Sequence, residues 1–441
     1  MSPTAEAPVL IKEEAPVVHS EAPAPPQHEH HHAHLGGFAS RGVIALICFF
    51  LINVASSFFA PIEFDRYKFP FHGWAWWVFN DLKNDRDMHN VALLGSSLTV
   101  SANAGCDANF LNTPLDLTGY HKTSYLDAQL KRIFGGTFST FNLSAPGEVP
   151  SDAYLYLKSM VTTQQRPEVV IYGVAPRDFI DSTMTSPSDS EAFGYLKRII
   201  SADEVASGFY RNWLGKLDLW LQHAVYLYGY SLDMQMYLTE AGTQILDIAA
   251  PRPYTNKPFT WWDRVSLLPK YKFGEVLPRS FVAAPLTREK AKAEYSDNTR
   301  EYIERYKMPD SHTFKTQFGF LRQLAAYCQR ERIELIVVNM PISLWNVQLL
   351  KPEHYYRYLF ELRKTAEDYN FTLLNAADWQ RYQREDFHDS VHLNAFGGTK
   401  FFDDLVRQIR QNPRAASAMD MAGQELSRRR SVAALKTANP N

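Results

Sequence analysis

Several features are scarce or missing in this sequence of 441 residues. It has only 3 Cys and no Cys/His spacing of the kind that holds structural zinc. Its formal net charge is −2, so it lacks the excess of Lys and Arg expected of a nucleic-acid-binding protein. There is no glycine-rich phosphate loop and no internal repeat. We therefore expect no cofactor, no metal and no nucleic-acid partner.

Cysteine usage leaves the cellular compartment open. Cys48 lies in a long apolar run, so only Cys106 and Cys328 remain for the rest of the chain. They can form one disulfide in an extracytoplasmic domain, and they can equally be two buried thiols.

One long run lacks charge altogether. Residues 42–60 would span about 28 Å as a helix, close to the hydrocarbon thickness of a bilayer. A signal peptide is the alternative to an anchor, but Phe58 and Phe59 stand where a cleavage site needs small residues. We predict a transmembrane anchor, preceded by a disordered tail over 1–41 that is rich in Pro, His, Ala and Glu.

An aromatic juxtamembrane segment is expected over 61–87. Its rings suit a membrane–water interface: Phe64, Tyr67, Phe69, Phe71, Trp74, Trp76 and Trp77. The flanking charges are Arg41 on one side and Arg66 and Lys68 on the other, which slightly favours a cytoplasmic domain.

Three short apolar runs predict buried parallel strands. They cover residues 91–94, 169–172 and 335–338, and each leads into an unusual loop. Helical patterns lie between and after them, around 151–165, 313–331, 352–369 and 395–411. The alternation predicts an α/β domain with a parallel sheet, whose ligand site lies beyond the carboxyl ends of the strands.

The predicted sheet domain covers 88–185 and 311–413. Between its two parts, residues 186–310 are rich in Tyr, Trp and Leu, and we expect an inserted subdomain, helical over about 202–248 and then irregular. Polar residues interrupt its apolar face, so we do not expect a second membrane span. Residues 414–441, rich in Ala, Ser, Arg and Asn, are expected to be a disordered tail.

Two blocks could carry chemistry. The first, Gly95-Ser-Ser-Leu-Thr99, follows a predicted strand. A serine at such a turn has an exposed hydroxyl, and the N–H groups at the start of the next helix can stabilise an oxyanion. The simpler interpretation is that these serines only cap the helix. The second covers 387–397. If it is helical, Asp389 and His392 share one face, so the carboxylate can orient the imidazole, and His388 points away. A surface turn is the alternative.

Together, G-x-S after a strand and D-x-x-H-x-N-x-x-G near the end resemble the SGNH (GDSL-like) hydrolase superfamily. Within it, the chain looks most like the membrane-anchored alginate and exopolysaccharide O-acetylation proteins. The resemblance implies a three-layer flavodoxin-like fold with Ser97 as nucleophile, His392 as base and Asp389 orienting it. It also implies an oxyanion hole formed by N–H groups of Ser97 and Gly147, the latter at the end of the block 141–147.

The sequence departs from the superfamily pattern in two blocks. The first block reads Gly-Ser-Ser in place of Gly-Asp-Ser. The third block, 173–178, has no asparagine for the oxyanion hole, so backbone N–H groups would form the hole without it. Arg177 and Asn142 are candidates for substrate binding.

The resemblance implies a membrane-anchored O-acyltransferase, with acetyl as the expected group, that modifies an exported polysaccharide. Its partners would be the polysaccharide acceptor and a multi-spanning membrane O-acyltransferase that supplies the acyl group. The domain would then lie on the periplasmic side of the inner membrane, although the flanking charges slightly favour the cytoplasmic side. A carbohydrate esterase with the same three residues and a non-catalytic anchored scaffold are the alternatives.

Three further signals are weaker. The tandem histidines in 28–34 could bind a divalent metal, but a solvated tract is the simpler interpretation. Trp261 and Trp262 could stack on sugar rings, or pack in a core or at the membrane interface. The run 428–430 of three arginines suits a solvated tail.

Overall fold

The computed structural model describes residues 35–58, 73–238 and 282–438, with short gaps at 164, 185, 198, 202, 211, 232–233, 235–236 and 308–309. The chain divides into two units, Met1–Pro61 and Ile62–Asn441. The first 34 residues, and the aromatic residues from Phe64 to Phe71, lie outside the described part.

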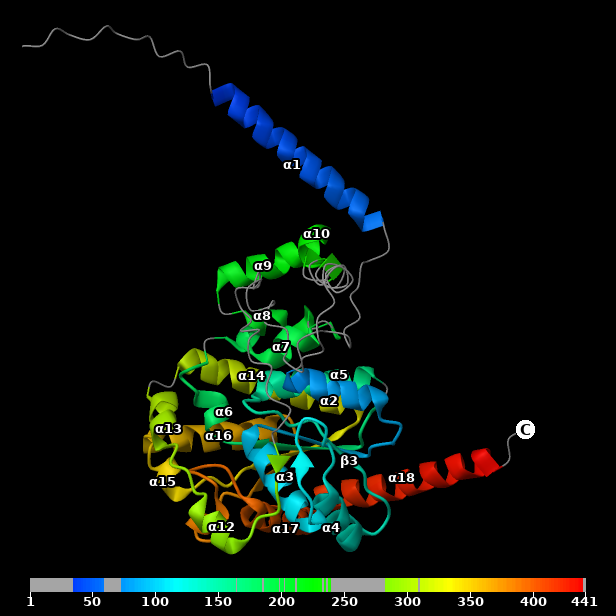
Figure 1. Ribbon diagram of the computed structural model, residues 1–441, viewed down its shortest axis with the longest axis vertical. Helices are drawn as coiled ribbons and strands as arrows, with labels where there is room; N and C mark the ends of the chain where they lie inside the picture. Colours follow the sequence, from blue (N-terminus) through cyan, green and yellow to red (C-terminus); the bar gives the residue numbers. More distant parts are fainter. Residues whose placement is uncertain are drawn as a thin grey trace, which may run out of the picture. The chain divides into compact units, whose positions relative to one another are not determined.

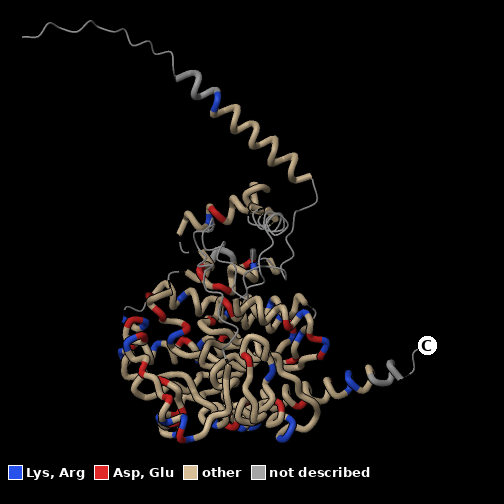
Figure 2. The backbone as a smooth tube through the Cα atoms, viewed as in Figure 1, with Lys and Arg blue, Asp and Glu red and all other residues tan. Residues whose placement is uncertain are grey.

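The described part of the first unit is one helix, α1 (Leu35–Phe58). Its stretch Arg41–Phe58 is long and apolar enough to cross a membrane, and its side chains are largely exposed. Figure 2 shows α1 almost without charge, whereas Lys, Arg, Asp and Glu are interspersed over the second unit. An exposed apolar helix of this length suits a bilayer better than water.

A five-stranded sheet forms the centre of the second unit, in the order β3-β1-β4-β6-β7 with every pair parallel. The strands are β1 (Val91–Gly95), β3 (Thr140–Asn142), β4 (Val169–Val174), β6 (Glu334–Asn339) and β7 (Thr372–Asn375). The three predicted strands are confirmed as the central ones. They are buried on both faces, which explains their near-continuous Val, Ile and Leu. Taken in chain order, the five strands follow the flavodoxin-like order 2-1-3-4-5.

Helices cover both faces of this sheet, so the unit has three layers (Figure 1). One layer contains α3 (Ser97–Leu111), α4 (Ser124–Phe134), α17 (Ala395–Gln411) and α18 (Pro413–Ala438). The other contains α2 (Trp74–Asn84), α5 (Pro150–Thr162), α14 (Ser311–Glu331) and α16 (Pro352–Asp368). Four of these helices lie within a few residues of the sequence prediction, and the α/β class is confirmed.

The remaining elements are mostly short. They are β2 (Leu115–Asp116), β5 (Val282–Ala283), α6 (Arg177–Ile180), α7 (Glu191–Leu196), α8 (Ala206–Phe209), α9 (Trp213–Ala224), α10 (Tyr226–Gly229), α12 (Arg288–Ala293), α13 (Thr299–Tyr306), α15 (Leu344–Val347) and the 3₁₀ turns Pro187–Asp189, Asp203–Val205 and Arg384–Asp386.

The expected disordered tail from Arg414 is wrong over the described residues, because α18 is a packed helix. Ala415, Met419, Ala422 and Leu426 are buried, and their spacing of four, three and four residues is that of one helix face. The Asn90 side chain donates a hydrogen bond of 2.9 Å to the Ala422 carbonyl. Within the predicted solvated arginine run 428–430, Arg429 pairs with Glu168 and is only partly exposed.

The interfacial role expected for the tryptophans of α2 is also wrong. Trp74 and Trp77 are each 7% exposed and pack edge to face with ring centroids 5.6 Å apart. Phe79 of the same helix stacks against Tyr156 of α5. Composition alone is compatible with aromatic rings in a core and at a membrane surface, and in this structure Trp74 and Trp77 lie in the core.

Parts of the expected insert join the core of the sheet domain. Phe209 of α8 packs between Phe193 and Phe320, at centroid distances of 4.4 and 4.5 Å. β5 pairs antiparallel with β2, which brings residues 282–283 beside α3. Cys106 and Cys328 are both buried free thiols, so no disulfide joins them.

Candidate active site

The turn from β1 into α3 presents Ser97. Gly95 ends the strand at φ +149°, where a side chain would clash with Thr99 Oγ1, so the tight turn requires glycine. Ser96 precedes the helix in an extended conformation, and Ser97 is its first residue. The serine therefore lies at the carboxyl end of a central strand, beside β4, where the strand order reverses.

The structure brings Ser97, His392 and Asp389 into one hydrogen-bonded chain. His392 Nε2 lies 2.8 Å from Ser97 Oγ, and His392 Nδ1 lies 2.6 Å from Asp389 Oδ2. With Nδ1 donating to the carboxylate, Nε2 is the nitrogen that can accept the serine proton.

The segment that carries Asp389 and His392 is a loop followed by α17, so of the two conformations considered, the helical turn is wrong and the surface turn is the one present. Phe387 and Leu393 form an isolated bridge, and His388 N–H donates to the His392 carbonyl at 2.7 Å. Asp389 Oδ1 accepts the N–H groups of Val391 and His392, both at 2.8 Å. This Asx-type turn brings the two side chains together as a helix would have done.

Electrostatics favour an ionised Asp389. Burial would raise its pKa, but the hydrogen bonds from His392 and the Val391 N–H outweigh burial and lower the pKa below its ordinary value. His388 does not point away, because it lines the same pocket as Ser97. Burial lowers the pKa of His388, which favours its neutral form.

Gly147 lies in a turn beside the nucleophile. Its φ is +82°, which favours glycine, and the preceding Ala145 donates its N–H to the Gly95 carbonyl at 3.0 Å. Within the described part of the chain, the N–H groups of Ser97 and Gly147 donate to no other protein group. Both are therefore available to an oxyanion.

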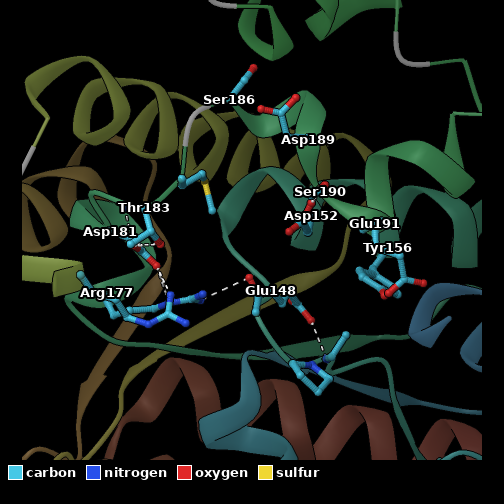
Figure 3. A pocket seen from close by; sticks show the side chains of 16 residues that line it. Glu148, Asp152, Tyr156, Arg177, Asp181, Thr183, Ser186, Asp189, Ser190 and Glu191 are labelled. Carbon is cyan, nitrogen blue, oxygen red and sulfur yellow. Dashed lines mark hydrogen bonds and ion pairs between the residues drawn. The ribbon is translucent and has the colours of Figure 1, made fainter. Parts of the chain in front are cut away.

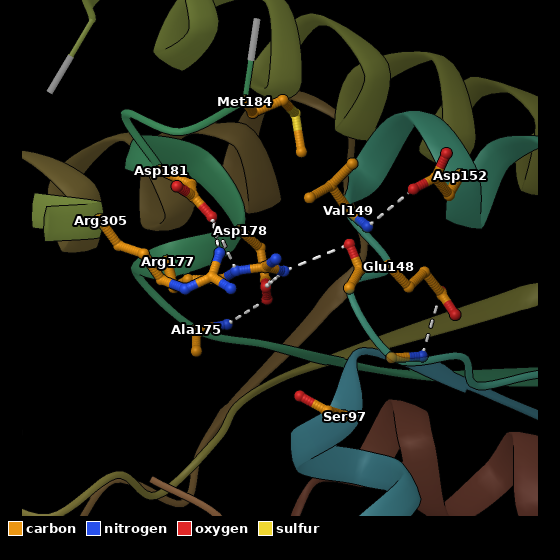
Figure 4. A network of polar contacts seen from close by, with 12 residues as sticks. Ser97, Glu148, Val149, Asp152, Ala175, Arg177, Asp178, Asp181, Met184 and Arg305 are labelled. Carbon is orange, nitrogen blue, oxygen red and sulfur yellow. Dashed lines mark hydrogen bonds and ion pairs between the residues drawn. The ribbon is translucent and has the colours of Figure 1, made fainter. Parts of the chain in front are cut away.

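The buried Glu148 and the partly buried Arg177 hold this turn (Figure 4). Glu148 accepts the N–H groups of Gly95 and Ala145, each at 3.1 Å, and so joins the two turns. Its pKa is raised well above the ordinary value, first by burial and then by the nearby Asp152. Arg177 Nη1 donates to the Gly147 carbonyl at 3.2 Å from the other side.

Glu148 was not found by sequence reasoning. The only available signal was its position directly after Gly147, and nothing in the sequence indicates that its carboxyl is buried.

The third block forms α6 and the turn before it. Asp178 Oδ2 accepts the Ala175 N–H at 2.8 Å, so this carboxylate is used to hold its own turn. Arg177 Nε lies 3.2 Å from Asp181 Oδ2, and Arg305 also pairs with Asp181. Arg177 is therefore fixed by acidic partners and by Gly147.

Arg177 also lines a polar pocket of about 310 Å³. Figure 3 shows Arg177, Asp181 and Thr183 on one side of it and Asp152, Ser190 and Glu191 on the other. Burial is the main cause that raises the pKa of Asp152 to about 7, although Ser190 donates a hydrogen bond to it.

Ser97, Asp389 and His392 line a second pocket of about 670 Å³. Most of its other lining residues are apolar or small, among them Trp74, Val100, Ala104, Leu117 and Leu286. The two pockets have Pro146 in common. The reactive groups thus lie beside a polar space and a largely apolar one.

Of the other candidate substrate-binding residues, Asn142 lines neither of these pockets. It lines a small cavity with His121 and Ser144, next to the pocket of Ser97, and its side-chain oxygen accepts the Ser144 N–H at 3.0 Å. Trp261 and Trp262 lie outside the described residues.

Comparison with known proteins gives little beyond the fold. No protein-family model matches this sequence, and no curated protein matches it. Among solved structures, the chain is similar to a "putative acylhydrolase" from Bacteroides fragilis NCTC 9343, with a TM-score of 0.31 and 8% identity over 76% of this chain and 96% of that one. A likeness this distant carries no argument about activity, which has to rest on the geometry of the site.

Proposed function

We propose that this chain is a membrane-anchored serine acyltransferase of the SGNH type, which transfers an acyl group to a hydroxyl of an exported polysaccharide. The observation that supports it most directly is the hydrogen-bonded chain from Ser97 Oγ through His392 to Asp389. Serine alone is a weak nucleophile, and an adjacent base held by a carboxylate is the arrangement that activates it.

Acylation of Ser97 is the first step. His392 Nε2 takes the Ser97 proton as Oγ forms a bond to the acyl carbonyl carbon. The N–H groups of Ser97 and Gly147 donate to the resulting oxyanion. When the tetrahedral intermediate collapses, the bond to the leaving group breaks, and that group takes the proton from His392.

Transfer to the acceptor repeats these steps in reverse. His392 Nε2 deprotonates the acceptor hydroxyl, whose oxygen attacks the acyl-serine carbonyl. Collapse breaks the bond to Oγ, and Ser97 regains its proton from His392. Asp389 stabilises the imidazolium in both steps and keeps its negative charge.

The polar pocket supports a polyhydroxylated acceptor. Carboxyl groups of Glu148, Asp152 and Asp181 and the guanidinium of Arg177 line it, and such groups form hydrogen bonds with sugar hydroxyls. Pro146 separates this pocket from the one that contains Ser97. An acceptor bound there would approach the acyl-serine from the side of the Gly147 turn.

The membrane setting completes the proposal. The apolar stretch Arg41–Phe58 would hold the catalytic unit at the inner membrane with its active site on the periplasmic side. A multi-spanning O-acyltransferase is the proposed partner, because an acyl group made in the cytoplasm has to cross the bilayer to reach Ser97.

Labelling of the full-length chain with a fluorophosphonate tests the nucleophile. We expect covalent modification of Ser97 that is lost in Ser97→Ala and strongly slowed in His392→Ala. Ser296→Ala, an exposed serine near the site, is the matched control and should label normally. Undiminished labelling of Ser97→Ala would overturn the assignment.

A second measurement tests the acceptor. In cells that carry Ser97→Ala, the acyl content of the exported polymer should fall if the chain is a transferase. A rise in acyl content would instead identify an esterase that removes the groups. No change, together with no labelling, would indicate a scaffold.

A further inference from the structure

The larger pocket, which contains Ser97, has a largely apolar lining, and the proposed acyl transfer does not explain why. Helix α3 contributes Ser97, Val100, Ser101, Ala104 and Gly105 to its lining. These positions are three, one, three and one residues apart, so they form one stripe along the helix that starts at the nucleophile. The side chains after Ser97 are small or aliphatic, and the Ser101 hydroxyl donates to the Leu393 carbonyl at 2.8 Å, so the groove alongside α3 is largely apolar.

A short extended segment forms the facing wall. Residues 282–286 all line the pocket, with Leu117 beside them. This wall is fastened at both ends. Ala283 pairs with Leu115, and Leu286 exchanges two hydrogen bonds with the Asn109 side chain, at 2.6 and 3.1 Å. Asn109 lies one turn beyond Gly105 on α3, so residues 282–286 are hydrogen-bonded to the same helix that lines the other side of the groove.

The length of the groove follows from the helix. The eight residues from Ser97 to Gly105 correspond to about 12 Å of helix axis. In an extended hydrocarbon chain, each C–C bond of about 1.5 Å advances the chain by about 1.25 Å. The stripe therefore matches eight to ten carbons, as an order-of-magnitude figure.

The volume is also large for a small acyl group. If each non-hydrogen atom takes about 30 Å³, as a water molecule does, an acetyl group fills about 90 Å³. The pocket has about 670 Å³. The charged groups in its lining are Lys290, Glu294 and Asp389, and the remaining walls offer few partners for a sugar.

We propose that the acyl group accepted by Ser97 is an aliphatic chain of about eight to ten carbons, which lies along α3 beneath the wall 282–286. This inference rests on the proposed acyl transfer and replaces the acetyl group expected from the sequence by a longer one. The acceptor still binds in the polar pocket, so the acyl chain and the acceptor lie on different sides of Pro146.

The test compares p-nitrophenyl esters of two, four, eight and twelve carbons on the full-length chain in detergent. Each fully buried methylene can raise kcat/KM by up to about fourfold. Because burial is partial, we expect octanoate to exceed acetate by at least about tenfold. Ala104→Trp fills the groove without touching the triad and should reverse this preference, while fluorophosphonate labelling of Ser97 persists.

Phe110→Trp is the matched control, since this exposed residue of α3 lies outside the pocket lining. If Ala104→Trp does not fold, Val100→Phe provides the same obstruction with a smaller change. The inference is overturned if the wild type prefers acetate, or if neither Ala104→Trp nor Val100→Phe changes the chain-length profile. Either result leaves the proposed acyl transfer unaffected. Absence of Ser97 labelling in the wild type overturns both.

Discussion

Replacing Asp389 by asparagine tests the catalytic chain most sharply, because the structure fixes how the new amide would be oriented. In the wild type, Oδ1 accepts two backbone N–H groups at 2.8 Å, and Oδ2 accepts the N–H of His392 Nδ1 at 2.6 Å. In Asp389→Asn, the amide oxygen can keep both backbone hydrogen bonds. Its NH₂ group then faces Nδ1 and donates to it.

That orientation inactivates the base. Once Nδ1 is an acceptor, the imidazole proton moves to Nε2, which can no longer take the proton of Ser97. The opposite amide orientation would restore the correct tautomer, but it leaves two backbone N–H groups facing an NH₂ group. Each unsatisfied group costs about 1–3 kcal/mol, so the inactive orientation is favoured by about 2–6 kcal/mol.

This difference predicts a rate about 30 to 3 × 10⁴ times lower, since each 1.36 kcal/mol is a factor of ten. The measurement is the rate of fluorophosphonate labelling at Ser97, with the thermal unfolding midpoint recorded on the same samples. Asp297→Asn removes an exposed carboxylate and should label at the wild-type rate. A folded Asp389→Asn protein within tenfold of the wild-type rate would refute the role given to Asp389.

Two further variants test the surroundings of the site. Gly147→Ala places a side chain at φ +82°, which costs about 1–2 kcal/mol and shifts the turn. If the Gly147 N–H binds the oxyanion, labelling of Ser97 should slow by about 10²–10³ without loss of the fold. A normal labelling rate would exclude this role. Asp152, with a pKa of about 7 in the folded state and 3.8 in the unfolded one, binds its proton more tightly when folded. Its stabilising effect is therefore complete below about pH 4 and is lost as the pH rises through 7, by at most about 4 kcal/mol. Asp152→Asn should reduce the fall in thermal midpoint between pH 5 and 8, and an equally steep fall would contradict the assignment.

The central part of the fold could be predicted because burial on both faces leaves a strong pattern. β1, β4 and β6 each contain an unbroken run of four apolar residues, whereas the edge strands β3 (Thr-Phe-Asn) and β7 (Thr-Leu-Leu-Asn) begin and end on polar residues. The error at α18 has a different cause. Ala-rich composition was taken for disorder, although Ala415, Met419 and Ala422 already show helical spacing.

At the site, the residue types were predictable and the geometry was not. The blocks around Ser97 and His392 identify a serine and an Asp–His pair, but only the folded chain brings them to hydrogen-bonding distance. Glu148 joins two turns through a carboxyl group whose burial depends on contacts from several elements. The wall 282–286 has an ordinary apolar sequence, and its role follows from pairing with β2 and from Asn109.

The 295 residues between Ser97 and His392 also set an order of events during synthesis. At about 5–20 residues per second, a ribosome needs about 15–60 s to reach the histidine after it has made the serine. Through that interval the nascent chain already has its apolar α1 but has neither His392 nor α17, so the serine has no base. We expect the chain to engage a membrane before it can form an acyl-enzyme, and any product of premature termination to be inert toward esters.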